Sequence, residues 1–163
     1  MSLIQFTLER NTIGDDLQRL VDKIANPGNA QKRMISDGIR QQFQANFSAR
    51  RSGNGPWASL APSTVLDRVR KGYPGNQPIL VRSGNLRDSY VNAGSPDHHT
   101  AVFSSGGYTV FEEGTNHRIA IFHERGTSRM AQRSVTLLDD GQTDRLATIV
   151  EWVIQSIERD TIR

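Results

Sequence analysis

The stretch AQKRMISDGIRQQFQANF, residues 30–47, places apolar side chains at four-residue intervals. Since an α-helix has 3.6 residues per turn, side chains with this spacing share one face and form a continuous apolar stripe. The stretch therefore predicts a long amphipathic helix that packs against the rest of the chain through that stripe. The stripe consists of Ile35, Ile39, Phe43 and Phe47.

The residues before this helix predict a strand and a second amphipathic helix. LIQFTLER, residues 3–10, alternates apolar and polar side chains, as a half-buried strand does. A helix is predicted from Gly14, with Asp15 and Asp16 near its positively polarised start. The NPGN segment, residues 26–29, ends it. Two helices joined by a short turn predict a helical hairpin.

The second half of the chain has the alternating pattern of β-structure. TAVFSS (100–105), YTVFEE (108–113) and HRIAIFHE (117–124) are predicted strands, with a hairpin turn at Gly114 between the last two. The third of these is apolar on both faces, which is typical of a central strand. SVTLL (134–138) is a candidate for a further strand.

DDGQTD then precedes a predicted C-terminal helix with a wide apolar face that runs from Leu146 to Ile157. The order strand, helices, strands, helix predicts an α+β fold in which helices pack on an antiparallel sheet. The 163 residues suit a single domain, 1–163. Within it, residues 48–80 are predicted to form a largely extended basic loop, or arm, with one short helix that begins at Pro62.

The composition limits the classes of protein to consider. A hydrophobic content of 36% and a mean hydropathy of −0.53 are polar for a globular domain, which favours long loops or surface that is buried between subunits. The chain has no cysteine, so disulfides and thiolate chemistry are excluded. We expect no signal peptide and no membrane partner, because no apolar run approaches ~18 residues.

Charge is distributed unevenly along the chain. Residues 50–90 hold 7 Lys or Arg and 2 Asp or Glu, a net charge of +5, whereas residues 91–163 hold 7 and 10, a net charge of −3. Three interpretations stay open. The basic block meets phosphate; or it meets the acidic end of a neighbouring subunit in a head-to-tail contact; or both blocks are solvated surface.

The sequence offers no strong catalytic or metal-binding motif. His117 and His123 are too far apart on one strand to share a metal ion, and His98 and His99 point to opposite faces. Glu112 and its neighbour Glu113 are expected to form a charge pair at a hairpin end. We therefore expect no enzyme, no metal and no cofactor. A hydrolase built on Glu112, Glu113, Glu124 and His123 remains an alternative.

GPWASLAPSTVLDRVRKG (55–72) followed by PILVRSGNLRDSY (78–90) resembles the phage virion morphogenesis family, the tail-completion proteins of long-tailed phages and prophages. The shared features are a tryptophan loop, a Leu-Ala-Pro-Ser-Thr helix start with basic residues after it, and a Leu-x-x-Ser-Gly-x-Leu turn. IAIFHERGT (119–127) resembles a later family segment with an aromatic, a histidine and a glycine. RMAQRSVTLLDD (129–140) lacks the Pro-Phe that the family usually has there.

The resemblance implies a structural protein of the virion, assembled in the host cytoplasm, that completes the head-proximal end of the tail or joins tail to head at the neck. It implies other virion proteins as partners, among them tail tube, terminator, neck or connector proteins. It further implies a homo-oligomer, with a hexameric ring as one form, and DNA in its lumen. A nucleic-acid-binding accessory protein that uses residues 50–90 is the alternative from another class.

Within this interpretation, six residues are candidates for an interface with an adjacent subunit. They are Trp57, Arg68, Arg70, Lys71, Tyr73 and Arg87. Aromatic and arginine side chains dominate interface energies. If Trp57 is such an anchor, Trp57→Ala disrupts assembly and leaves the circular dichroism nearly unchanged. Trp57 also fits a second interpretation, in which it pins the long loop to the body of its own chain.

Three further residues are predicted to have structural roles in turns. Ser83 is expected to cap a short helix through its hydroxyl, and Gly84 to supply a tight backbone turn before that helix. Gly126 is expected to play a similar part after the segment that contains His123.

Overall fold

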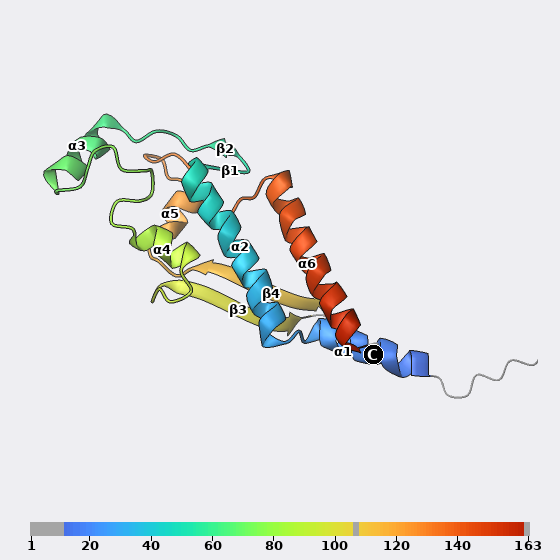
Figure 1. Cartoon of the computed structure of the whole chain (residues 1–163). Helices are drawn as coiled ribbons and strands as arrows, with labels where there is room; N and C mark the ends of the chain where they lie inside the picture. Colours follow the sequence, from blue (N-terminus) through green and yellow to red (C-terminus); the bar gives the residue numbers. More distant parts are fainter. Residues whose placement is uncertain (1–11, 106–107, 162–163) are drawn as a thin grey trace, which may run out of the picture.

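A computed structural model of the chain describes residues 12–105 and 108–161. This part of the chain holds six helices and two small antiparallel two-stranded sheets, β1–β2 and β3–β4 (Figure 1). In chain order the elements are α1 (Thr12–Ala25), α2 (Asn29–Ala49), β1 (Arg51–Ser52), β2 (Gly55–Pro56), α3 (Pro62–Arg70), α4 (Asn85–Val91), β3 (His98–Ser105), β4 (Tyr108–Thr115), α5 (Ala120–Arg125) and α6 (Asp140–Thr161).

Helix α2 lies at the centre of the fold, with α6 packed on it from one side and α4 from another (Figure 1). Its predicted apolar stripe is confirmed, and the stripe serves two clusters. Phe43 and Phe47 belong to the main core, whereas Ile35 packs with Val153 and Ile157 of α6. The other buried members of the main core are Trp57, Leu80, Leu86, Tyr90, Ala120 and Val135.

The main core is built around aromatic rings in edge-to-face contact. The ring centroids of Phe47 and Trp57 are 5.7 Å apart at an interplanar angle of 82°, and those of Phe43 and Tyr90 are 5.6 Å apart at 78°. This geometry is favoured because the positive ring edge meets the negative ring face. The indole Nε1 of Trp57 donates to the carbonyl of Ser134 at 3.0 Å, so the buried polar atom is satisfied.

Helix α6 confirms the predicted C-terminal helix and crosses α2 closely. A Cβ atom on Gly38 would lie 2.6 Å from Ile149 Cδ1, so a larger residue at this crossing would force the Ile149 side chain to move. Near the start of α6, the Gln142 amide donates to Asn46 Oδ1 at 2.9 Å, and Asn46 Nδ2 donates to the carbonyl of Val135 at 2.8 Å. These buried amides tie α6 and the segment before it to α2.

The strands β3 and β4 confirm the first two predicted strands and their antiparallel pairing. The register pairs His98 with Thr115 and His99 with Gly114. Gly114 therefore lies inside β4, and the prediction of a hairpin turn there is wrong. Residues 106–107, between the two strands, lie outside the described part of the chain.

Two predicted strands are absent from the described structure. Residues 117–124 form a turn and the short helix α5. The strand prediction failed because a short run that is apolar on both faces has no periodicity that distinguishes a strand from a helix. Residues 134–138 form no strand either. There, side chains replace a strand partner: Val135 N donates to Glu124 Oε1 at 2.9 Å.

The pair of N-terminal helices is confirmed, although α1 packs mainly on α6 and β4. The predicted strand at residues 3–10 lies outside the described residues. Among the helices described, none has both the length and the apolar character that crossing a membrane requires.

Candidate functional site

Residues 50–84 form an arm that carries α3 away from the body of the molecule (Figure 1). Arg68 fixes its fold, since this side chain is buried and its Nη1 donates to the carbonyls of Gln77 and Pro78 at 3.2 and 3.3 Å. Tyr73 receives the guanidinium of Arg82 over its ring, 5.5 Å from the centroid. Outside α3 and the two-residue strands β1 and β2, the arm has no helix or strand, and these contacts hold it in place.

A groove of about 760 Å³ separates the arm from α4, α5 and residues 129–133. Its lining is strongly basic. Five arginines line it, and Asp67 is the one carboxylate among the lining residues. Asp67 pairs with Lys71 at 2.9 Å, and this bond lowers the pKa of Asp67. The arginines are Arg68, Arg82, Arg118, Arg129 and Arg133.

Two of these arginines are buried in the fold and three are exposed, although Arg82 also lies over the Tyr73 ring. Arg133, like Arg68, is buried, and it donates to the carbonyls of Ala58 and Ser59 at 2.8 and 2.9 Å. Arg82, Arg118 and Arg129 are exposed, and none has a carboxylate within 4.0 Å among the described residues. The groove therefore presents unneutralised positive charge, which attracts an anionic partner.

His117 and His123 also line the groove. His123 Nδ1 is buried and has no hydrogen-bond partner in the described part of the chain. Burial lowers the pKa of His123, and the nearby charge of Arg133 lowers that pKa further. His123 is therefore a neutral imidazole near neutral pH. The expectation that His123 sits at a strand end is wrong, because it lies on α5.

Beside the groove, Glu124 joins the core to the segment before α6. Its carboxylate accepts hydrogen bonds from Tyr90 Oη at 2.7 Å, Thr136 Oγ1 at 2.9 Å and the Ser134 hydroxyl, in addition to Val135 N. Burial raises the pKa of Tyr90, and the negative charge of Glu124 raises it further. These bonds give Glu124 a structural role.

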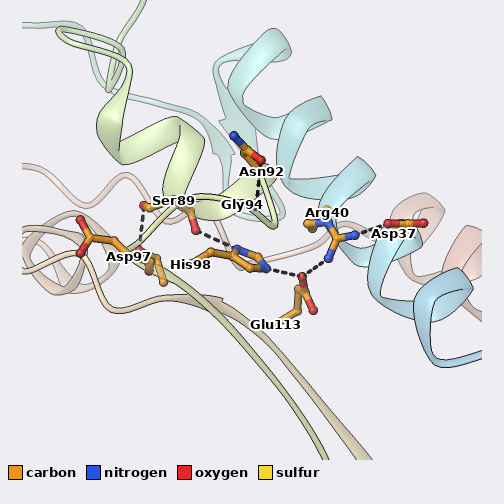
Figure 2. A network of polar contacts seen from close by, with 9 residues as sticks. Asp37, Arg40, Ser89, Asn92, Gly94, Asp97, His98 and Glu113 are labelled. Carbon is orange, nitrogen blue, oxygen red and sulfur yellow. Dashed lines mark hydrogen bonds and ion pairs between the residues drawn. The ribbon is translucent and has the colours of Figure 1, made fainter. Parts of the chain in front are cut away.

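Glu113 lies in a different, buried network that Figure 2 shows. Its Oε1 accepts from Arg40 Nη1 at 2.6 Å and lies 2.8 Å from His98 Nε2. His98 Nδ1 donates to the carbonyl of Ser89 at 3.0 Å. Arg40 also pairs with Asp37. The network ties α2, α4, β3 and β4 together, so the expectation of a hairpin-end charge pair is wrong for Glu113.

The four residues of the hydrolase alternative are thus held in separate settings. Glu113 belongs to the buried network, and the Glu124 carboxylate is bonded to Tyr90 and residues 134–136. Glu112 is exposed beside His99, at 3.1 Å. In the described residues, no three histidine, aspartate or glutamate side chains are grouped so as to hold a metal ion.

The structure places the six interface candidates in unlike positions. Trp57 is only 6% exposed, so it is the core anchor of its own chain and is not available as an interface anchor. Arg68 is likewise buried, by its bonds to the arm's backbone. Arg70 and Lys71 are exposed at the end of α3. Of the last two, Tyr73 stacks with Arg82, and Arg87 pairs with Asp88 at 2.7 Å.

The three turn residues line or border the same region. Gly84 is the residue before α4 and has a φ of 90°, as glycine allows. The prediction that Ser83 caps this helix is wrong, because α4 starts one residue later and has no side-chain cap. Gly126 ends α5 with a φ of 70°, and a Cβ there would lie 2.9 Å from Gln132 N.

Sequence reasoning missed most of the free charge in the groove. Arg82 stood inside the quoted turn segment without being singled out, and Arg118 and Arg129 lie outside the basic block. Arg118 precedes α5 and Arg129 follows it, and a strand at residues 117–124 would have kept these two side chains apart.

No family model, no curated protein and no solved structure matches this chain.

Proposed function

We propose that the chain is a structural protein of a phage tail or neck, which completes the head-proximal end of the tail or joins tail to head. The basic groove carries this proposal. The two segments with the strongest resemblance to virion morphogenesis proteins, 55–72 and 78–90, supply one wall of the groove and part of the other. The resembling residues thus build one wall of a basic surface, and this supports an acidic partner.

The surroundings of the groove suit a protein partner. On α3, Leu66 and Val69 are 58% and 57% exposed, and on α5, Ile121 and Phe122 are 47% and 50% exposed. None of these four side chains lines the groove itself, but they lie on two elements that border it. Exposed apolar side chains beside polar ones favour a docking surface. A partner with acidic and apolar side chains would bury both kinds of surface, as the cores and rims of protein interfaces do.

Electron microscopy of particles made without the chain tests this function. The coding sequence is deleted from the phage or prophage genome and the wild-type chain is supplied in trans as the control. The proposal expects filled heads and tails that stay separate, and joined particles when the chain is restored. Normal joined particles in its absence would contradict the proposal.

A nucleic-acid-binding accessory protein is the second candidate, favoured by the arginines of the groove. It predicts affinity for duplex or single-stranded DNA that falls steeply with salt, because neutralised phosphates release counterions. A DNA titration at two salt concentrations, with wild type and with Arg118→Glu/Arg129→Glu, checks it. A salt-dependent affinity that this variant loses would support the second candidate.

A further inference from the structure

Helix α6 carries a row of four acidic residues on one face. Asp144, Glu151 and Glu158 are seven residues apart, which is close to two helical turns, and Asp140 lies one turn before the first. The four side chains therefore share one stripe, called here the acidic stripe. At 1.5 Å per residue it is roughly 27 Å long.

The acidic stripe points away from the core. The buried side chains of α6 include Val153 and Ile157, which lie on the opposite face of the helix. None of the four carboxylates has a basic side chain within 4.0 Å in the described residues. The stripe is thus unneutralised negative charge, the counterpart of the groove.

The groove and the acidic stripe cannot meet within one molecule. Helix α2 lies between them: α4, whose first residues line the groove, packs on one side of α2, and α6 packs on another side (Figure 1). Two different surfaces of one chain that complement each other join copies head to tail, and such contacts build rings or filaments.

We propose that the basic groove of one copy binds the acidic stripe of a second copy of this chain. This inference rests on the proposed function, because it names the partner of the groove. Arg118 and Arg129 of one copy meet Glu151 and Glu158 of the next. Exposed apolar side chains lie beside both surfaces, with Ile119 lining the groove and Trp152, 61% exposed, on α6.

The charge balance of the chain favours a second copy over nucleic acid as the occupant. The excess of positive charge in residues 50–90 is offset by the excess of negative charge in residues 91–163, so the whole chain carries only +3. A surface for a polyanion needs no acidic counterpart. A surface that binds a second copy of the same chain needs an acidic counterpart on that copy. Opposed charged patches of this kind fix the register of the contact and the choice of partner.

A charge-exchange experiment on the intact chain tests the inference by light scattering. The groove variant is Arg118→Glu/Arg129→Glu, and the stripe variant is Glu151→Lys/Glu158→Lys. The side chains of Arg118, Arg129 and Glu151 are exposed, and that of Glu158 is half-buried. Circular dichroism therefore checks that both variants fold. The control is Arg19→Glu/Arg33→Glu, on α1 and α2, which changes the net charge by the same amount as the groove variant.

We expect wild type and control to form a complex that weakens with salt, and each charge variant alone to associate at least about tenfold more weakly. Mixing the two variants restores the complex, since an acidic groove then meets a basic stripe and an unchanged groove meets an unchanged stripe. A monomeric wild type, variants that associate as well as wild type, or a mixture that stays monomeric would each overturn the inference.

A groove variant that loses DNA affinity while wild type stays monomeric would assign the groove to nucleic acid instead. The self-association experiment and the particle-joining experiment can fail independently of each other. If particles lacking the chain fail to join but wild type never self-associates, the self-docking inference fails and the virion role stands. If the complex forms as expected but particles assemble normally without the chain, the virion role fails.

Discussion

Trp57 and Trp152, the two tryptophans of the chain, occupy opposite environments. Trp57 is buried against Phe47 and bonded to Ser134, whereas Trp152 is 61% exposed. Trp57→Ala leaves a large cavity and an unpaired carbonyl, so we expect a loss of about 3–5 kcal/mol in the free energy of unfolding. Trp152→Ala should change it by no more than about 0.5 kcal/mol. Urea unfolding followed by circular dichroism compares them, and equal losses would contradict this account.

Glu113 and its neighbour Glu112 offer a second matched pair. The Glu113 side chain is 1% exposed between Arg40 and His98, whereas that of Glu112 is 50% exposed. Glu113→Ala would leave the largely buried Arg40 guanidinium paired only with the exposed Asp37, at a cost of about 3 kcal/mol. Glu112→Ala should cost less than about 1 kcal/mol. Chemical denaturation measures both, and a Glu113 variant as stable as the Glu112 variant would show that the buried network contributes nothing.

His123 predicts a pH dependence of stability. Its pKa in the fold is lower than the ordinary value of 6.5, mainly because it is buried. The unfolded chain therefore takes up a proton at His123 more readily than the folded chain. This group lowers the free energy of unfolding as the pH falls through 6.5 toward its folded pKa, and has no such effect above 6.5.

His123→Gln removes this titration, so the stability of the variant should fall less steeply on acidification than that of wild type. Urea midpoints at about pH 8 and about pH 5.5 give the two slopes. Since all other residues are the same in both proteins, the difference between the slopes isolates His123. Parallel slopes would contradict the prediction.

At the scale of elements, α5 and the turn after it decide how the groove is formed. Gly126 has a φ of 70° and a backbone nitrogen 2.9 Å from the place a Cβ would take. Gly126→Ala should therefore cost about 1–3 kcal/mol. Gly114→Ala is the control, because a Cβ there meets nothing within 4 Å and φ is not positive. Thermal unfolding of both variants tests this, and equal stability would refute the close approach at Gly126.

The elements also show where sequence patterns suffice. The stripe of α2 and the apolar face of α6 were predictable, because long helices repeat their period many times. The residues of α5 were misassigned, since four consecutive apolar side chains fit a central strand equally well. In the structure, only Ala120 of α5 is buried, and Ile121 and Phe122 are exposed. That these two apolar side chains are exposed is what the sequence pattern alone does not reveal.

At the scale of the molecule, the sequence predicted opposed charge blocks but not the surfaces that they form. Arg118 and Arg129 belong to the acidic half of the chain and join the groove only because α5 places them beside the arm. The acidic stripe was not predicted, because Asp140 and Asp144 were placed before the C-terminal helix, whereas α6 begins at Asp140. Its isolation from the groove required the packing of α2 between them.

The proposed role in virion assembly depends on the groove, and one complementation measurement tests this most directly. Particles that lack the chain are supplied with wild type, with Arg118→Glu/Arg129→Glu or with the control Arg19→Glu/Arg33→Glu, and joined particles are counted by electron microscopy. We expect wild type and control to restore joining and the groove variant to leave heads and tails separate. A folded groove variant that restores joining as well as wild type would contradict the account.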